Sequence, residues 1–275
     1  MTTPAFSPYD YNFGDLAKEL ESNTPSTLSP ANWTILRLDG HCFHTYARPF
    51  EKPFDKYLSQ AMVFTTIDLC KEFNAVSGYT QSDEISLLLP PTKIDPETKE
   101  QQPLIFKGRK QKLESLSAGF ASVRFNYHIS RNAVPDNNIE STKLQKMNSY
   151  TAYFDSRAIS VASLADVEKV FQWRSLFDCY RNGISALAQH IFGHKKLHEK
   201  NTAMKLAMLA DTGIQLEDYP PALFYGTFVK KQQIEKACTN FKTGAPEICL
   251  RSEHVAKIIP IPPVPADFQD FLSRP

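Results

Sequence analysis

Three carboxylates lie in two turns of the sequence and could together do metal chemistry. Asp39 directly follows an apolar run (WTILRL), and Asp83 and Glu84 lie at the predicted tip of a hairpin. Mg²⁺ prefers one or two carboxylates combined with backbone carbonyls, waters and substrate phosphates. Two such ions about 3.5–4 Å apart catalyse phosphoryl and nucleotidyl transfer. Each turn alone is equally well explained as an ordinary acidic turn, so the metal hypothesis requires a fold that joins them.

Basic side chains that could receive a triphosphate lie nearby in the sequence. Arg109 and Lys112 belong to the segment KGRKQK at the start of a predicted helix, where free backbone N–H groups also favour anions. Lys52 and His44 lie in the segment after the first strand. A basic helix start or a single loop lysine is also compatible with a solvated surface, so these residues are candidate phosphate contacts.

An alternation of β-type and helical segments supplies the framework. The β-type runs are 33–38, 75–80, 85–89 and 150–154, and the helical runs are 54–73 and 108–125. This order predicts an α+β fold with a ferredoxin-like βαββαβ core, in which the first and third strands are central neighbours. Asp39 and Asp83 would then lie at the same edge of one sheet, although they are 44 residues apart.

The C-terminal part is predicted to add helices and strands to this core. Helical spacing covers 167–192 and 201–210, and a β-type run covers 222–230. The segment 130–148 is predicted to be a loop, and 236–275 receives no assignment. The domain prediction is a catalytic domain over 1–155 and a helical extension over 156–275, packed together as one compact unit.

A polar cluster interrupts the long apolar helix predicted in the C-terminal part. Asp178 and Asn182 share a face at i and i+4, and Arg181 lies between them. Buried polar groups must be paired, so a structural hydrogen-bond network explains this cluster as well as a nucleotide or RNA contact does.

The composition excludes several classes of protein. The 275 residues are 42% hydrophobic and 22% charged, typical of a globular chain. A net charge of +1 gives no overall polycationic field, so RNA contacts would need local patches. No apolar run reaches the ~18–20 residues of a membrane helix, and the start shows no signal peptide. We therefore expect a cytoplasmic protein with no membrane partner. The five cysteines form no CxxC pair, against a disulfide framework or cysteine zinc site.

Six segments of the chain resemble, in order and spacing, the tRNA-histidine guanylyltransferase superfamily, specifically its guanylyltransferase-like 3′-to-5′ polymerase branch. They are RLDGHCFHTYARPFEKPFD, GYTQSDEISLLL, FKGRKQKLESLSAGFAS, AYFDSRAI, FQWRSLFDCYRNGISALAQ and HKKLHEKNTAMKLAML. The resemblance implies a polymerase-type palm domain, two Mg²⁺ ions, and GTP and ATP as substrates. It also implies a homotetramer that adds nucleotides to the 5′ end of the tRNA acceptor stem.

The resemblance also implies roles for individual residues. Asp39 and Asp83 match the metal-bridging carboxylates, the Gly40 carbonyl completes a metal site, and Glu84 matches an outer or second-metal ligand. The positions that match nucleotide contacts are His44, Lys52, Ser82, Arg109, Lys112 and Asn182. The positions that match tRNA contacts are Arg181, Lys195, Lys196, Lys200 and Asn201.

One departure from the family pattern bears on the reaction. Eukaryotic enzymes that add the extra G to tRNA-His have a His-Ile-Asn-Asn type motif where this chain has DCYRN at 178–182. At this motif the chain resembles the branch whose members favour template-dependent repair of 5′-truncated tRNAs. In the implied reaction, the tRNA 5′-monophosphate is adenylylated by ATP, or the tRNA already carries a 5′-triphosphate. The 3′-hydroxyl of an incoming nucleoside triphosphate then attacks the activated 5′-phosphate.

Two other functions are compatible with these residues. Nucleotide cyclases also place carboxylates on a βαββαβ palm, but they convert nucleotide without RNA. A tRNA-binding protein without activity is the second alternative, and the presence of all the expected carboxylates counts against it.

Overall fold

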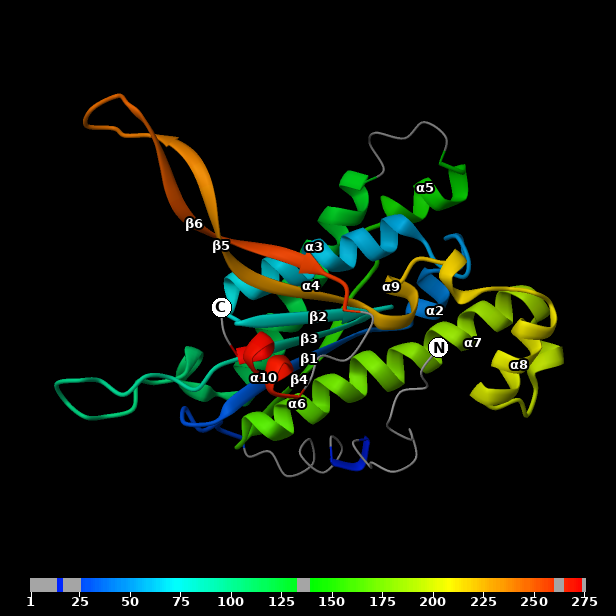
Figure 1. The fold of residues 1–275 in the computed structure, drawn as a ribbon, viewed down its shortest axis with the longest axis horizontal. Coiled ribbons are helices and arrows are strands. Elements are labelled where there is room, and N and C mark those ends of the chain that lie inside the picture. The colour runs from blue at the N-terminus through cyan, green and yellow to red at the C-terminus, as the bar shows by residue number, and fades with distance from the viewer. Residues whose placement is uncertain (1–13, 17–25, 133–138, 260–264, 274–275) are drawn as a thin grey trace.

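A six-stranded antiparallel sheet forms the centre of the molecule (Figure 1). The computed structural model describes residues 14–16, 26–132, 139–259 and 265–273. The strands are β1 (Trp33–Gly40), β2 (Ser77–Gln81), β3 (Glu84–Leu89), β4 (Phe154–Val161), β5 (Thr227–Thr239) and β6 (Pro246–Lys257). Their order is β4-β1-β3-β2-β5-β6. The first four strands confirm the predicted ferredoxin-like core, with β1 and β3 as central neighbours.

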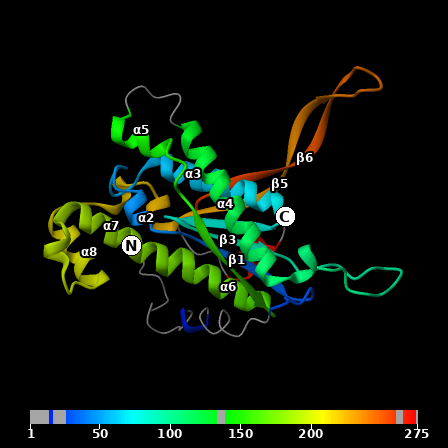
Figure 2. The same ribbon diagram turned by 180° about the vertical axis from the view of Figure 1, so that it is seen from behind.

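Helices cover both faces of this sheet. They are α2 (Phe43–Tyr46), α3 (Lys56–Glu72), α4 (Lys110–Asn132), α5 (Ser141–Met147), α6 (Leu164–Gln172), α7 (Cys179–Phe192), α8 (Thr202–Asp211), α9 (Ala222–Tyr225) and α10 (Pro265–Ser273). Helices α3 and α4 lie on one face, and α6 and α10 lie on the other (Figures 1 and 2). None of the helices in the described ranges is long and apolar enough to cross a membrane.

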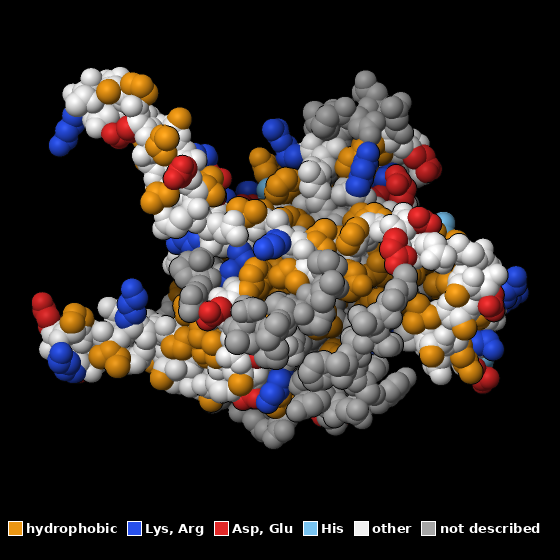
Figure 3. Space-filling view, viewed as in Figure 1, with side chains coloured by type: hydrophobic (Ala, Val, Ile, Leu, Met, Phe, Trp, Pro, Cys, Tyr) orange, Lys and Arg blue, Asp and Glu red, His pale blue; other side chains and the backbone are white. Residues whose placement is uncertain are grey.

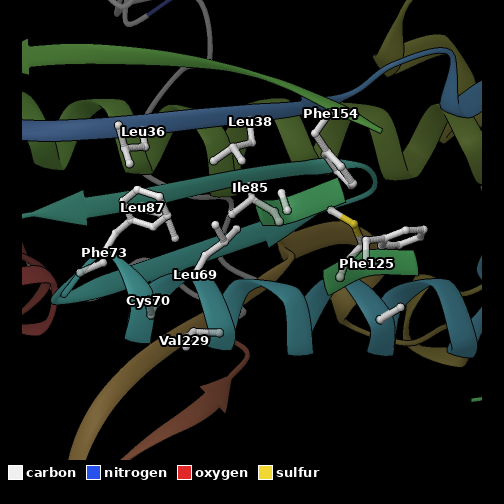
Figure 4. Packing of buried hydrophobic residues seen from close by; sticks show 14 of the residues in the cluster. Leu36, Leu38, Leu69, Cys70, Phe73, Ile85, Leu87, Phe125, Phe154 and Val229 are labelled. Atoms are coloured by element: carbon white, nitrogen blue, oxygen red, sulfur yellow. The ribbon is translucent and has the colours of Figure 1, made fainter. Parts of the chain in front are cut away.

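The alternation of side chains along the strands divides the core in two. Leu36 and Leu38 of β1 point toward α3 and α4, where Leu69 and Phe125 pack against them (Figure 4). Ile35 belongs to the second core, which includes residues of α6 and α10. Because successive strand residues point to opposite faces, Leu36 and Leu38 enter the first core, whereas Ile35 enters the second and Arg37, on the same face as Ile35, pairs with Glu84. Asp39 is the first acidic residue of the strand.

The start of α3 shows why the predicted helix over 54–73 is correct. Asp55 is the N-cap, and its carboxylate accepts hydrogen bonds from the backbone N–H groups of Tyr57 and Leu58. This cap satisfies two of the donors that the first turn of a helix leaves without partners. The cap therefore fixes where the chain turns back from the sheet edge into α3.

Three local predictions were wrong. The strand predicted over 150–154 is β4, which begins at Phe154, because its alternation of charged and apolar residues continues to Val161. The predicted loop over 130–148 includes the end of α4 and all of α5. The predicted strand over 222–230 begins with the short helix α9, which follows two prolines and ends at Gly226 with φ of 65°. The predicted division into two domains after residue 155 stays a prediction, and β4 spans that position.

The unassigned C-terminal region forms two different structures. Strands β5 and β6 pair over twelve positions and project beyond the sheet as an arm (Figure 1). Helix α10 packs Phe268 and Leu272 into the second core. The carbonyl of Leu272 accepts hydrogen bonds from Ser77 Oγ at 2.7 Å and Lys230 Nζ at 3.1 Å. This end of α10 is thereby attached to β2 and β5.

Candidate active site

The end of β1 and the turn between β2 and β3 meet at one edge of the sheet. Asp39 is the register partner of Glu84, and Gly40 N donates a hydrogen bond to the Asp83 carbonyl at 3.0 Å. Ser82 adopts φ of 47°, and its hydroxyl donates to Asp83 Oδ1 at 2.9 Å. The structure thus brings Asp39, Asp83 and Glu84 together as the sequence predicted. The Gly40 backbone lies between the two aspartates that the sequence assigned to metal binding.

The electrostatics of this edge disfavour two adjacent charged aspartates. Burial raises the pKa of Asp39 to about 6, and repulsion from Glu84 and Asp83 adds to the effect. The pKa of Asp83 is also raised, mainly by burial, while the Ser82 hydrogen bond opposes the rise. His44, in α2, lies close enough to lower the pKa of Asp83 slightly. A cation at this edge would relieve the repulsion between these carboxylates.

A fourth carboxylate at the same edge was missed by the sequence reasoning. Asp155 of β4 is the register partner of Asp39 and contributes to its raised pKa. The predicted strand ended at Phe154, so Asp155 fell outside it. Alternation places Asp39, Glu84 and Asp155 on the sheet face that carries Ile35, the face of α6.

Glu84 has surroundings that differ from those expected of a metal ligand. Its Oε1 accepts a hydrogen bond from Arg37 at 3.1 Å, and its Oε2 accepts one from Arg174 at 3.3 Å. Gln81 Nε2 donates to Oε2 as well, at 3.2 Å. Both carboxylate oxygens are therefore engaged by protein donors, and Glu84 joins the hairpin tip to the helix that carries Arg174.

A π turn positions that helix. The helical segment predicted over 167–192 is confirmed as α6 and α7, but a π turn over Trp173–Asp178 connects them. Arg174 Nη1 donates to Asp178 Oδ2 at 3.2 Å, and Gln81 Nε2 donates to the same oxygen at 3.2 Å. Arg181 pairs with Oδ1 of Asp178. The polar cluster is thus a structural network around Asp178 and Glu84, which we call the arginine network: Arg37, Gln81, Glu84, Arg174, Asp178 and Arg181.

Lys52 lies in the loop between α2 and α3. Its Nζ donates to the Ala47 carbonyl at 3.0 Å, and burial lowers its pKa, while nearby Asp55 opposes this. The peptide bond between Lys52 and Pro53 is cis. The amine is therefore held within the loop that follows the first strand and α2.

Arg109 and Lys112 lie at the opposite edge of the sheet from the carboxylates. Arg109 pairs with Thr27, which precedes β1, and Leu28 N donates to the Gly108 carbonyl at 2.8 Å. Helix α4 then runs back along β4: Glu114 accepts from Ala158 N, and Ser122 accepts from Phe154 N. Within one chain, these two basic residues are not brought to Asp39 and Asp83.

The predicted tRNA contacts lie in the helical part of the chain after β4. Lys195 and Lys196 are exposed in a 3₁₀ turn between α7 and α8, and Lys200 is exposed just after it. Figure 3 shows Lys and Arg side chains at this end of the molecule. Asn201 is the N-cap of α8, because its Oδ1 accepts from Met204 N at 2.9 Å. Asn182 is exposed on α7.

No three His, Cys, Asp or Glu side chains in the described parts of the chain form a ready-made metal centre. Mg²⁺ does not need one, since waters and substrate phosphates complete its shell. Asp39 and Asp83 supply two oxygen donors, and burial, with a smaller contribution from the neighbouring Glu84 carboxylate, raises the pKa of both. The donor set therefore fits a hard divalent cation.

A family model and several known proteins are similar in sequence to this chain. A family model described as tRNA-His guanylyltransferase (Thg1) matches residues 14–162. Protein R259 of Acanthamoeba polyphaga mimivirus, described as uncharacterized, is 37% identical over 227 residues, covering 81% of this chain and 78% of that protein. The tRNA(His) guanylyltransferase of Debaryomyces hansenii is 28% identical over 160 residues, covering 57% of this chain and 53% of that enzyme.

Solved structures of related proteins share the fold. A bacterial tRNA(His) guanylyltransferase-like protein in complex with ATP has a TM-score of 0.66 and 28% identity, covering 94% of this chain and 98% of that one. The complex of such a bacterial protein with GTP gives a TM-score of 0.64 and 26% identity, with 95% and 99% covered. The fold and these relatives define a nucleotidyltransferase. More particularly, the chain belongs to the tRNA-His guanylyltransferase family, whose model covers more than half of it.

Proposed function

We propose that this protein adds nucleotides to the 5′ end of a tRNA in the 3′-to-5′ direction, in a template-dependent repair reaction. The supporting observation is the meeting of Asp39 and Asp83, held together by the hydrogen bond from Gly40 N to the Asp83 carbonyl. ATP adenylylates the tRNA 5′-phosphate with release of pyrophosphate, and the 3′-hydroxyl of an incoming nucleoside triphosphate such as GTP then attacks that phosphate and displaces AMP. Solved relatives in complex with ATP and with GTP support these substrates.

Asp39, Asp83 and the Gly40 carbonyl would hold two Mg²⁺ ions. The metal supplies activation of the attacking hydroxyl and neutralisation of charge on the transferring phosphates. The chain's own residues hold the reacting groups. Ser82 orients the Asp83 carboxylate through its hydroxyl, and His44 lies beside that carboxylate. The arginine network fixes the hairpin tip, so that Asp83 keeps its position relative to Asp39.

The exposed lysines Lys195, Lys196 and Lys200 are the proposed contacts to the tRNA backbone. A net charge of +1 provides little general attraction for RNA, so these local charges must supply it. Joining the basic patches of several subunits would enlarge that surface, and we propose a homotetramer. The mass in solution, measured by light scattering, tests this assembly; a monomer would contradict it.

Repair is proposed over G addition because residues 178–182 are DCYRN, where the enzymes that add the extra G to tRNA-His have a His-Ile-Asn-Asn type motif. In this chain Asp178 has a structural role, because its two carboxylate oxygens accept hydrogen bonds from Arg174, Gln81 and Arg181.

The experiment offers Mg²⁺, ATP and all four nucleoside triphosphates with two 5′-monophosphorylated tRNAs: intact tRNA-His, and a tRNA lacking its first nucleotide. We expect extension of the truncated tRNA by the base complementary to its template position. Extension of tRNA-His alone would replace repair with G addition. Absence of extension, with conversion of nucleotide alone, would instead indicate a cyclase.

Two controls make the result specific to the proposed site. Chelation with EDTA should abolish extension, and excess Mg²⁺ should restore it. Asp95→Asn changes a half-buried aspartate in the loop after β3, where Asp95 Oδ1 accepts from two backbone N–H groups. This variant should retain wild-type activity, whereas Asp39→Asn should not.

A further inference from the structure

A pair of stacked rings lies at the rim of the carboxylate edge. The rings of His41 and Tyr153 have centroids 4.8 Å apart and an interplanar angle of 23°. His41 N donates to the Tyr153 carbonyl at 2.9 Å, which ties the two backbones together directly beyond β1 and β4. His41 is exposed, and Tyr153 is 53% exposed. Two exposed rings held in a fixed arrangement offer a ligand a flat apolar surface.

The strand register relates the rings to the carboxylates. Asp39 pairs with Asp155 and Gly40 pairs with Phe154, so the bond from His41 to Tyr153 continues the same ladder by one step. Along a strand, residues two apart project to the same side and are about 7 Å apart. The backbone positions of His41 and Tyr153 therefore lie about one sugar–phosphate unit from those of Asp39 and Asp155.

We infer that the ring pair of His41 and Tyr153 is a stacking platform for a nucleobase. This inference rests on the proposed function, because it identifies which part of the substrate lies beside the carboxylates. A planar base has an apolar face that stacks on aromatic rings irrespective of its sequence. The platform costs little to organise, since the ring stack and the backbone hydrogen bond already hold it.

Two sources can supply the base. One is the incoming nucleoside triphosphate, and the other is the nucleotide at the 5′ end of the RNA. Both need the same flat apolar surface at this distance from the reacting phosphate. Stacking without hydrogen bonds to base edges would accept any base. This suits a reaction in which the template, and not the protein, selects the nucleotide.

The test measures equilibrium binding with ligands that differ only in the base. In the first arm, 3′-deoxy-GTP, which lacks the attacking hydroxyl, is compared with inorganic triphosphate in Mg²⁺. In the second, a 5′-truncated tRNA is compared with the same tRNA made abasic at its first position. We expect Tyr153→Ala to weaken binding of the base-containing ligand in one arm by about 5- to 140-fold, with binding of the base-free ligand unchanged.

Matched variants separate stacking from structural damage. Tyr153→Phe keeps the ring and should bind within about twofold of wild type. Tyr150, in the same segment, is 64% exposed. Tyr150→Ala should leave binding of both kinds of ligand unchanged. Equal binding by Tyr153→Ala and wild type in both arms would overturn the platform, as would equal losses for base-containing and base-free ligands. The binding test measures no turnover. Failure of the stacking proposal can therefore be told apart from failure of the proposed function, in which wild-type protein would extend no tRNA.

Discussion

Two groups of acidic side chains lie side by side at one sheet edge in opposite surroundings. Glu84 and Asp178 belong to the arginine network, where each carboxylate forms ion pairs with two arginines. Asp39 and Asp83 form no ion pair with any described residue, and their pKa values are raised. A raised pKa means that the ionised form destabilises the folded state. The first group thus stabilises the fold, whereas the second retains negative charge that an external cation can neutralise.

The sharpest test of this contrast is Asp39→Asn. We expect activity to fall by at least about 100-fold, as when a key electrostatic group is removed. The folded-state pKa of Asp39, about 6, exceeds its ordinary value, so ionisation of Asp39 lowers the stability of the folded wild type as pH rises toward 6. Above pH 6 the ionised Asp39 carboxylate continues to destabilise the folded state. At pH 7.5, the variant should therefore melt no lower than wild type. Nucleotide-addition assays and thermal denaturation check both points, and residual activity above about one hundredth of wild type would contradict the assignment.

The arginine network should respond in the opposite way. Arg174→Met leaves Glu84 and Asp178 each without one partner, so we expect a loss of about 2–3 kcal/mol in the free energy of unfolding. Activity should also fall, because the hairpin tip that carries Asp83 loses an anchor. Urea denaturation and the Mg²⁺ dependence of the rate measure these effects. Arg174→Lys, which keeps the charge, should recover part of both; unchanged stability in Arg174→Met would show that the network is not structural.

The opposite edge of the sheet should affect stability alone. Gly108 has φ of 68°, and a Cβ there would lie 2.5 Å from the Leu28 carbonyl oxygen. We expect Gly108→Ala to cost about 1–3 kcal/mol of stability while kcat/KM stays at the wild-type level. Denaturant titration and steady-state kinetics at a temperature where the variant is folded check this. A loss of kcat/KM in the folded variant would mean that this edge also contributes to the reaction.

The smallest effect is expected in the projecting arm. Phe241 lies in the turn between β5 and β6 and is fully exposed. Replacing it with serine should change the free energy of unfolding by less than about 0.5 kcal/mol, because it removes no core contact. Chemical denaturation of Phe241→Ser measures this. A larger loss would show that the arm is part of the cooperative core.

Sequence patterns predicted the parts of the site that depend on regular elements. Asp39 and Asp83 converge because strand order and a short hairpin determine where each turn lies. Asp155 was missed because the aromatic run before Phe154 resembles a strand more closely than β4 does. The arginine network could not be predicted, since its contacts depend on a π turn that breaks the 3.6-residue period. The positions of Arg109 and Lys112 follow from topology, because a helix after β3 must begin at the edge where β3 ends.

The π turn has a genetic consequence. A π turn accommodates one more residue than the equivalent α-helical turn, so it corresponds to a single inserted codon. Phe171 of α6 packs into the second core, whereas Leu187 of α7 packs against α8 and α9. Because the turn absorbs its extra residue locally, losing one residue within 173–178 would give a regular helix with both packed faces kept, whereas losing one residue from α7 beyond the turn would rotate the residues after it by about 100°. The packing of α6 and α7 therefore depends on the number of residues outside the turn more than on the number within it.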